Sequence, residues 1–337
     1  MDALSTPDLT KAERELYSHF LCYVKSMALK CAVDLGIPEA IYQRGGATTL
    51  HEIVTGVGVH PSKLPQLRRL MNVLSFSGMF VRTPIVSATD TGNGAGEDAV
   101  VYELTPTSRL LVTGDDKAGL SLLLQYLAGP TIVSSFFSMK TWFKGEHGDT
   151  TTFFELTHGC DLWENNRKDG DDNNKLNVAM VADSRLVMEI FLKEAGANVL
   201  RGVSTLVDVG GGHGQASKAI AAAFPHVKCT VMDLPHVVSH APTDDKVEFI
   251  AGDMFKHIPP ADAVLLKVLR RCKEAISAKG PVGKVIIIDV VMGSEQRDMV
   301  TKETQGLYDL YMIFINGIER DENQWRKIFV ATRSSPS

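Results

Sequence analysis

The chain has 337 residues, which is long enough for two domains with hydrophobic cores of their own. Its 40 Asp and Glu residues outnumber its 35 Lys and Arg residues, and the resulting formal net charge of −5 argues against a nucleic-acid scaffold. The five cysteines are scattered and never spaced as Cys-x-x-Cys, so the sequence predicts neither a disulfide framework nor a zinc knuckle.

The N-terminus has no basic region followed by an apolar core, as a secretory signal would have, and no uninterrupted apolar run reaches membrane length. We therefore expect a soluble, cytoplasmic protein with no membrane partner.

Residues 1–112 read as a mainly helical domain. Apolar side chains recur at spacings of three and four over residues 13–41, with a break at Gly36-Ile-Pro, and they face more than one side. Such a helix at the start of a chain is more often a partner-chain interface than a free surface. Shorter helices follow over residues 49–53 and 61–77, and then two strand-like pieces over 79–82 and 100–104, which together make a winged-helix plan.

A winged-helix plan raises the alternative of DNA binding, because Lys63, Arg68 and Arg69 lie on the second helix. A basic stripe this short on an acidic protein is typical of a solvated face, so DNA binding is disfavoured.

Residues 113–200 form a helical linker region. Aromatic and methionine side chains at helical spacing, such as Phe136, Met139 and Trp142, are typical of a core. The polar run from Asn165 to Asn174 is predicted to be an exposed loop.

Residues 201–330 alternate between strands and helices. Continuous apolar strands alternating with helices predict a buried parallel sheet covered on both faces, a Rossmann-like doubly wound α/β fold. We expect strands near 205–209, 228–233, 247–251, 262–267 and 284–290, helices near 214–224, 269–278, 303–316 and 321–330, and a disordered tail over 331–337.

A glycine-rich turn follows the first strand, at Gly210, Gly212 and Gly214. Glycines let the backbone take positive φ and let a ligand approach the main chain. The third glycine comes one position earlier than in the dinucleotide fingerprint, where Gln215 would have to be glycine, so a nicotinamide oxidoreductase is disfavoured.

Acidic residues stand at the ends of the next two strands. Asp233 follows the glycines by about 20 residues, and Asp253 repeats the plan on the third strand. Because ligands of parallel sheets bind at the carboxyl ends of the strands, these positions predict a nucleoside slot, in which Asp233 accepts hydrogen bonds from ribose hydroxyls.

From about Glu15 to Phe329 the chain resembles the plant S-adenosylmethionine-dependent O-methyltransferases of the caffeate, flavonoid and acetylserotonin type. The segments that carry the resemblance are Asp208-Val-Gly-Gly-Gly-His-Gly, Asp233-Leu-Pro-His, Gly252-Asp-Met-Phe, Ala261-Asp-Ala-Val-Leu-Leu-Lys267 and Asn316-Gly-Ile-Glu-Arg.

The resemblance implies a class I methyltransferase domain preceded by a winged-helix dimerisation domain, with S-adenosylmethionine as the cofactor and a small phenolic or indolic substrate. It also implies a homodimer, or a heterodimer with related methyltransferases. The residues implied to bind the cofactor are Gly210, Gly212, Asp233, Leu234, Asp253, Met254 and Lys267, and those implied to line the acceptor pocket are Trp142, Phe153, His158, Leu176, Met180 and Phe314.

The chain departs from the resembling family where that family has its catalytic histidine, just after the strand ending at Lys267. A phenol with a pKa of about 10 needs a base at pH 7, and neutral histidine is the usual one. None of the ten histidines follows Lys267, and the loop between strand and helix is missing, which we interpret as a deletion of roughly a dozen residues. The resemblance leaves two catalytic carboxylates, Asp289 and Glu319.

Other histidines are weaker candidates. His213 in the glycine turn and His257 could lie near the slot, although solvated loop histidines are the more common case. His236 and His240 have the spacing of metal ligands, but with Pro235 beside them and no third ligand we expect a surface pair and no metal site.

The end of the chain is also short, since the family continues into closing strands after Phe329. Two hypotheses follow: an O-methyltransferase slowed by the loss of its base, or a catalytically impaired splice form or pseudoenzyme that dimerises with active relatives.

Overall fold

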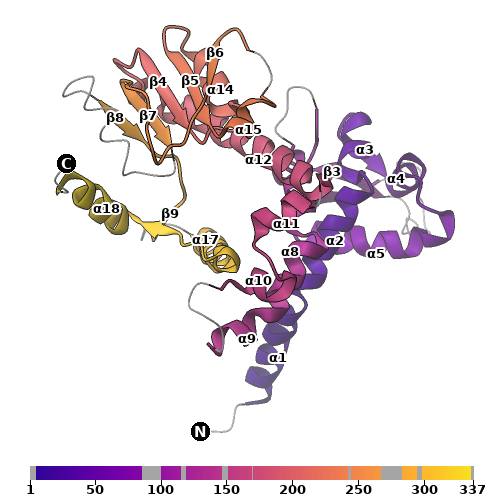
Figure 1. Cartoon of the computed structure of the whole chain (residues 1–337). Coiled ribbons are helices and arrows are strands. Elements are labelled where there is room, and N and C mark those ends of the chain that lie inside the picture. The colour runs from indigo at the N-terminus through magenta and orange to yellow at the C-terminus, as the bar shows by residue number, and fades with distance from the viewer. Residues whose placement is uncertain are drawn as a thin grey trace. The chain divides into compact units, whose positions relative to one another are not determined.

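The computed structural model describes residues 5–85, 100–114, 119–145, 151–168, 170–241, 244–266, 283–293 and 298–334. The chain divides into two compact units. The first contains Met1–Ser134 and Gly170–Ala182, and the second contains Ser135–Asp169 and Asp183–Ser337 (Figure 1).

The first unit is mainly helical with a small antiparallel sheet of order β1-β3-β2. Its helices are α1 (Thr6–Phe20), α2 (Cys22–Asp34), α3 (Ile37–Gln43), α4 (Leu50–Val57), the 3-10 turn η1 (Pro61–Lys63), α5 (Leu64–Phe76) and α6 (Pro106–Arg109). Its strands are β1 (Ala47–Thr49), β2 (Phe80–Pro84) and β3 (Val100–Leu104). The expected order of helices and paired strands is confirmed; residues 86–99 of the connecting loop lie outside the described residues.

Local signals in the sequence explain where these helices begin. The predicted break at Gly36 is present: Gly36 has φ +71°, in the left-handed region that suits glycine, and precedes α3. Thr49 and Glu52 form a capping box that starts α4, and the backbone hydrogen bond from Thr49 is the main cause that lowers the pKa of the Glu52 carboxyl. These helices enclose a core whose fully buried members include Ile37, Ile41, Ile53, Met71, Leu74, Phe80 and Tyr102.

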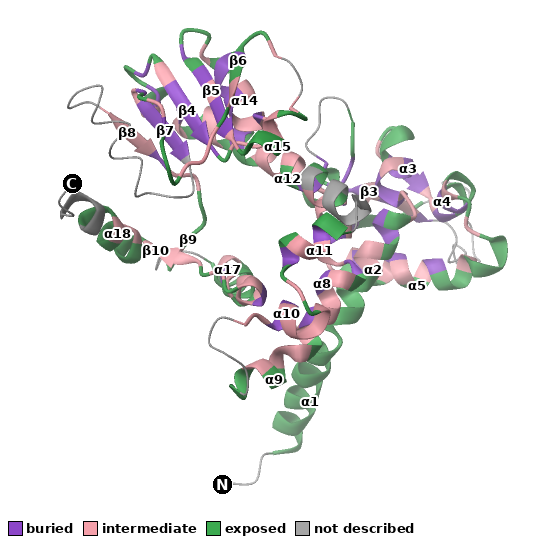
Figure 2. Ribbon diagram, viewed as in Figure 1, coloured by how far each residue is buried: buried purple, intermediate pink, exposed green. Residues whose placement is uncertain are grey.

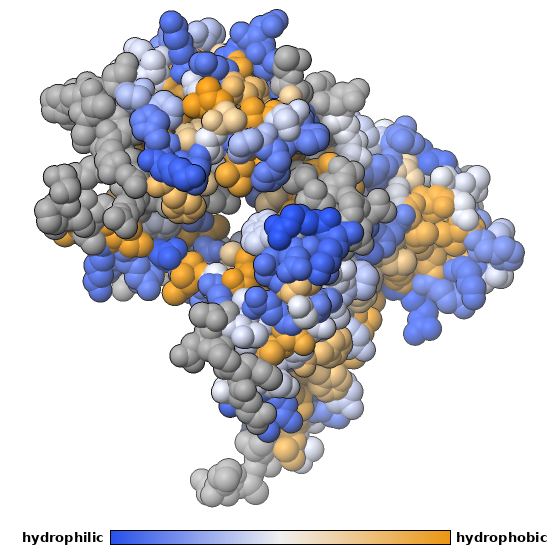
Figure 3. Space-filling model, in the orientation of Figure 1, coloured by the Kyte–Doolittle hydropathy of each residue, from blue (hydrophilic) through white to orange (hydrophobic). Residues whose placement is uncertain are grey.

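α1 buries none of its residues. Leu16 is 61% exposed, Phe20 is 50% exposed, and Tyr23 at the start of α2 is 68% exposed. Figure 2 colours α1 as exposed along its length, and Figure 3 shows apolar side chains among those on the molecular surface. A run of large apolar side chains left open to water is typical of a surface that another protein chain covers.

The next helices are α7 (Ser121–Leu127), α8 (Pro130–Ser135), the 3-10 turn η2 (Phe136–Ser138) and α9 (Met139–Phe143). Within the described part of the chain, residues 121–143 are long and apolar enough to cross a membrane by length and composition alone, which is weak evidence because core helices of other proteins pass the same test. The absence of a membrane partner therefore stays a prediction.

The predicted loop over residues 165–174 is wrong. α10 (Phe153–His158) is followed by α11 (Leu162–Lys168) and α12 (Gly170–Phe191), which continues through a π turn (Leu192–Gly196) into α13 (Ala197–Val199). The Asp161 carboxylate accepts the Glu164 N–H at 2.7 Å, and Glu164 pairs with Lys168 at 2.8 Å. This cap and this i,i+4 pair stabilise a helix despite the polar composition, and Asn166 is buried.

The second unit contains a five-stranded sheet of order β6-β5-β4-β7-β8 in which every pairing is parallel (Figure 1). The strands are β4 (Thr205–Val209), β5 (Lys228–Asp233), β6 (Val247–Ala251), β7 (Ala263–Leu266) and β8 (Lys284–Ile286), and the helices beside them are α14 (Gln215–Ala223) and α15 (Pro235–Val238). The predicted parallel α/β sheet is confirmed.

Both faces of this sheet are buried. Leu206 packs into one core with Ile220 of α14, whereas its neighbour Val207 packs into a separate core with Ile258. Because successive strand residues point to opposite faces, the continuous apolar runs of the sequence fill two cores.

β8 is shorter than the predicted strand 284–290. Its register with β7 pairs Lys284 with Ala263 and Ile286 with Leu265, and the described part of β7 ends one residue later. Residues 287–290 are not part of a strand in the described structure. The predicted helix 269–278 and Cys272 lie outside the described residues.

The C-terminal part of the second unit contains β9 (Val291–Met292), α17 (Met299–Met312), the 3-10 turn η4 (Ile313–Ile315), β10 (Arg320–Asp321) and α18 (Glu322–Ser334). β9 and β10 form a separate two-stranded parallel sheet. α18 continues through Ser334, into the segment predicted as a tail.

Candidate active site

Glycines and an acid meet at the carboxyl ends of β4 and β5. Gly210 and Gly212 follow β4 with φ +70° and +58°, conformations that side chains other than glycine rarely adopt. Asp233 is the last residue of β5, and its carboxylate accepts the Gly212 N–H at 2.8 Å and the Leu234 N–H at 2.7 Å. A carboxylate has about four lone-pair sites, so these two bonds leave capacity for hydroxyl groups of a ligand.

The turn after β6 joins the same edge. The Gly252 N–H donates to the Asp233 carbonyl at 2.9 Å, and the Asp253 carboxylate accepts the Phe255 N–H at 2.9 Å. The Met254 methyl lies 3.4 Å from where a Cβ on Gly210 would stand. The structure thus places residues from three neighbouring strand ends together at one rim.

Six of the seven residues implied to bind the cofactor are described, and all six lie at this rim; their role in binding stays a prediction. Lys267 lies outside the described residues, as does the strand-to-helix gap that follows it.

The Asp208 side chain packs directly against the glycine turn. It is buried, accepts the Ser217 hydroxyl at 3.0 Å, and has its pKa raised to about 6, mainly by burial. A Cβ on Gly211 would stand only 2.6 Å from this carboxylate, so the turn rests directly on it. Ser217 was not among the predicted site residues; its place in the first turn of the helix after the glycines was the only signal for it.

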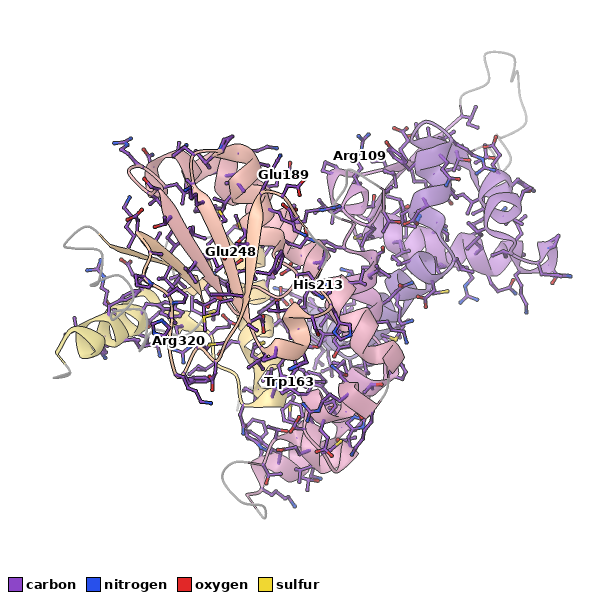
Figure 4. The ribbon with its side chains drawn as sticks, turned by 45° about the horizontal axis from the view of Figure 1, so that its top comes forward. Arg109, Trp163, Glu189, His213, Glu248 and Arg320 are labelled. Carbon is purple, nitrogen blue, oxygen red and sulfur yellow. The ribbon has the colours of Figure 1, made fainter. Side chains whose placement is uncertain are left out.

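The two predicted catalytic carboxylates, Asp289 and Glu319, which we call the carboxylate pair, precede β9 and β10. β9 and β10 pair in parallel, with Arg320 (labelled in Figure 4) opposite Val291. The two backbone segments that carry Asp289 and Glu319 therefore lead into neighbouring strands. Asp289 is exposed and lies beyond β8, whereas the sequence predicted it within a strand ending at residue 290.

The pKa of Tyr308 in α17 is influenced by the charges of both members of the pair. The pKa of its phenol is raised, first by burial and then by the negative charges of Asp183, Glu319 and Asp289. Sequence reasoning missed Tyr308 and Asp183, because neither stands in a recognisable motif.

Four of the six predicted pocket residues belong to one aromatic cluster of the second unit. Phe153 and Phe314 are buried with ring centroids 6.4 Å apart, and Trp142 stands edge-on to Phe153 at 5.9 Å. His158 lies 4.4 Å from Phe154, which also contacts Phe314. Phe153, Phe154 and Phe314 are buried against one another, so the cluster is a packed aromatic core, and its place in an acceptor pocket stays a prediction.

The other two pocket residues, Leu176 and Met180, lie on the part of α12 that belongs to the first unit. Their place in a pocket stays a prediction.

The remaining histidine candidates have local roles or none that the structure assigns. His213 sits in the turn between β4 and α14 (Figure 4), and His257 donates its backbone N–H to the Asp253 carbonyl. A His240 ring nitrogen lies 2.7 Å from the His236 carbonyl oxygen. Among the residues that the structure describes, no group of three His, Cys, Asp or Glu side chains is arranged to hold a metal ion.

Comparison with known proteins finds two domain families along the chain. The O-methyltransferase dimerisation domain family matches residues 17–114, and the O-methyltransferase domain family matches residues 136–332. The chain is 47% identical to acetylserotonin O-methyltransferase 3 of Oryza sativa subsp. japonica, over 97% of this chain and 90% of that protein. It is 40% identical to trans-resveratrol di-O-methyltransferase of Vitis vinifera, over 96% and 91%.

Solved structures share the fold at low sequence identity. Human N-acetylserotonin methyltransferase in complex with SAM matches with a TM-score of 0.71 and 19% identity, over 97% of this chain and 93% of that one. A methyltransferase of calicheamicin biosynthesis in its SAH-bound form matches with a TM-score of 0.75 and 18% identity, over 98% and 93%. The fold is therefore that of class I methyltransferases with a helical dimerisation domain, and the chain belongs to the plant S-adenosylmethionine-dependent O-methyltransferase family.

Proposed function

We propose that this chain transfers a methyl group from S-adenosylmethionine to a hydroxyl of a small phenolic or indolic compound. The observation that carries the proposal is the Asp233 carboxylate, held by the Gly212 N–H at the rim where three parallel strands end. In this place it can accept the ribose hydroxyls of an adenosine, while the open backbone at Gly210 and Gly212 gives the ligand access to the main chain.

The acceptor class rests on the aromatic cluster and on the relatives. The buried rings of Phe153 and Phe314 make this part of the second unit apolar and aromatic, which suits a neighbouring aromatic acceptor. Two relatives that span nearly the whole chain are named for acetylserotonin and trans-resveratrol, an indolic and a phenolic acceptor.

We further propose that turnover is slow, because no histidine follows Lys267 in the sequence. A positioned general base typically contributes 10²–10⁴-fold, whereas orientation of two bound reactants can supply about 7–11 kcal/mol. Loss of the base alone would therefore slow the reaction without abolishing it. S-adenosylmethionine supplies an activated methyl group, and this chain would contribute the alignment of the acceptor hydroxyl with it.

The pH dependence of the rate tests this proposal. Without an enzymatic base, the reactive species is the acceptor's own phenolate, so kcat/KM for trans-resveratrol should rise about tenfold per pH unit from pH 6 to 9. The rate is measured as S-adenosylhomocysteine formed per enzyme, with Asp233→Ala as the control that loses cofactor contact. A plateau above about pH 7 would reveal a histidine-like base and contradict the proposal of a missing base.

An absence of turnover at every pH, with cofactor binding intact, would instead support the second candidate. That candidate is a catalytically impaired chain that pairs with active relatives, and the exposed Leu16, Phe20 and Tyr23 would form part of its pairing surface.

A further inference from the structure

We propose that two residues of α17, Gln305 and Asp309, are positioning residues that hold the carboxylate pair in place. The inference rests on the proposed function, because it assigns a role within the same reaction. Neither residue would touch the reacting atoms; both act through the backbone that carries Asp289 and Glu319.

Each of these two residues forms a hydrogen bond with one of the two backbone segments that carry the carboxylate pair. The Asp309 carboxylate accepts the N–H of Glu319 at 2.9 Å, so it fixes the backbone of that acid directly. The Gln305 amide donates to the Val291 carbonyl at 3.0 Å, two residues beyond Asp289. Gln305 is buried, with 6% of its surface exposed, so its amide has little water to replace this bond, although Val291 itself is 37% exposed.

Gln305 and Asp309 are four residues apart on α17, so the two hydrogen bonds act together. Residues four apart lie on one face of a helix. From the same side of α17, Gln305 therefore bonds β9 and Asp309 bonds the residue before β10. A parallel ladder of only two residues per strand is too short to fix its own geometry. The helix therefore supplies the rigidity that the ladder lacks, and rigid placement of catalytic groups matters because a shift of about 1 Å can cost about 10²-fold in rate.

Tyr308, between the two positioning residues, reports whether Glu319 is in place. After partial burial, the negative charges of Asp183, Glu319 and Asp289 raise the pKa of its phenol, because they disfavour the phenolate. The test is a double-mutant cycle on the Tyr308 pKa, read by NMR of tyrosine labelled at Cζ and assigned with Tyr308→Phe.

In the wild-type background, Glu319→Gln should lower the Tyr308 pKa, because one negative charge is lost. In the Asp309→Ala background the same substitution should have a clearly smaller effect, because Glu319 is no longer held beside the phenol. Asp309→Asn keeps an acceptor oxygen while removing the charge, so the full effect of Glu319→Gln should return. An equal effect of Glu319→Gln in all three backgrounds would overturn the inference.

Gln305→Met gives a second cycle in case Asp309→Ala does not fold. It removes the donor to Val291 at similar volume, and it should reduce the effect of Asp289→Asn on the Tyr308 pKa; an undiminished effect would overturn the role of Gln305. In turnover, Asp309→Ala should lower kcat about 10- to 100-fold, with KM for the acceptor unchanged and with rescue by Asp309→Asn. Because the tyrosine cycles need no turnover, an inactive wild-type chain would count against the proposed function and leave the cycles to decide this inference.

Discussion

The buried Asp208 carboxylate, at the candidate site, lowers the free energy of unfolding at neutral pH. Burial raises the pKa of its carboxyl from 3.8 to about 6, with the charge of Asp233 a smaller cause in the same direction. The folded chain therefore holds a proton that the unfolded chain has lost between about pH 4 and pH 6, so this group lowers stability as pH rises through that range. Above pH 6 the cost is complete, at about 3 kcal/mol.

Asp208→Asn should remove this cost while keeping an acceptor for the Ser217 hydroxyl. We expect the free energy of unfolding of the variant, relative to wild type, to increase by about 2.5 kcal/mol between pH 4 and pH 7.5. Urea unfolding of both proteins at the two pH values measures this difference. A difference that does not change with pH would contradict the raised pKa.

At this scale, sequence reasoning found the residues that motifs mark and missed those that only contacts mark. The contact between Asp233 and Gly212 followed from two strand ends on one edge of a parallel sheet. Ser217, Gln305 and Asp309 stand on ordinary helices, and their bonds to Asp208, Val291 and Glu319 depend on packing that no local pattern encodes.

The elements of the sheet were the most predictable part of the fold. β4, β5 and β6 begin and end at the expected residues, because apolar runs bounded by Gly, Asp and Pro leave few alternatives. The polar run before Met180 was misread, since capping by Asp161 and the Glu164–Lys168 pair outweigh its loop-like composition. The strand predicted over 284–290 was too long, because β8 ends at Ile286.

Gly214 joins the glycine turn to α14 and is expected to be the most sensitive of these glycines. It has φ +76°, and a Cβ there would stand 3.0 Å from the Phe249 ring and 3.1 Å from Val231. Gly214→Ala should therefore combine backbone strain with overpacking and destabilise the protein by about 2–4 kcal/mol.

Gly202→Ala is the matched control, because Gly202 also has φ +76° but nothing lies within 4 Å of its added Cβ. It should cost only about 1 kcal/mol from strain. Chemical denaturation of the two variants separates the effects, and equal losses would show that the contacts with Phe249 and Val231 cost nothing.

At the scale of the whole molecule, the change in periodicity predicted a mainly helical first part and an α/β last part, whereas the dimerisation and methyltransferase roles were implied by the family resemblance. The two family matches, at residues 17–114 and 136–332, have this order along the chain, although the alternation of strands and helices begins only near residue 205. Whether the chain turns over depends on the stretch after Lys267, which no general property of the fold decides.

Calorimetric titration of the whole chain with S-adenosylmethionine tests the proposed cofactor site most directly, because it requires no acceptor and no turnover. We predict saturable binding to wild type at one site per chain and at least about tenfold weaker binding to Asp233→Ala, since the substitution removes the acceptor for the ribose hydroxyls and the partner of the Gly212 N–H. Identical heats and affinities for the two proteins, or no binding to either folded protein, would contradict a cofactor site at this rim.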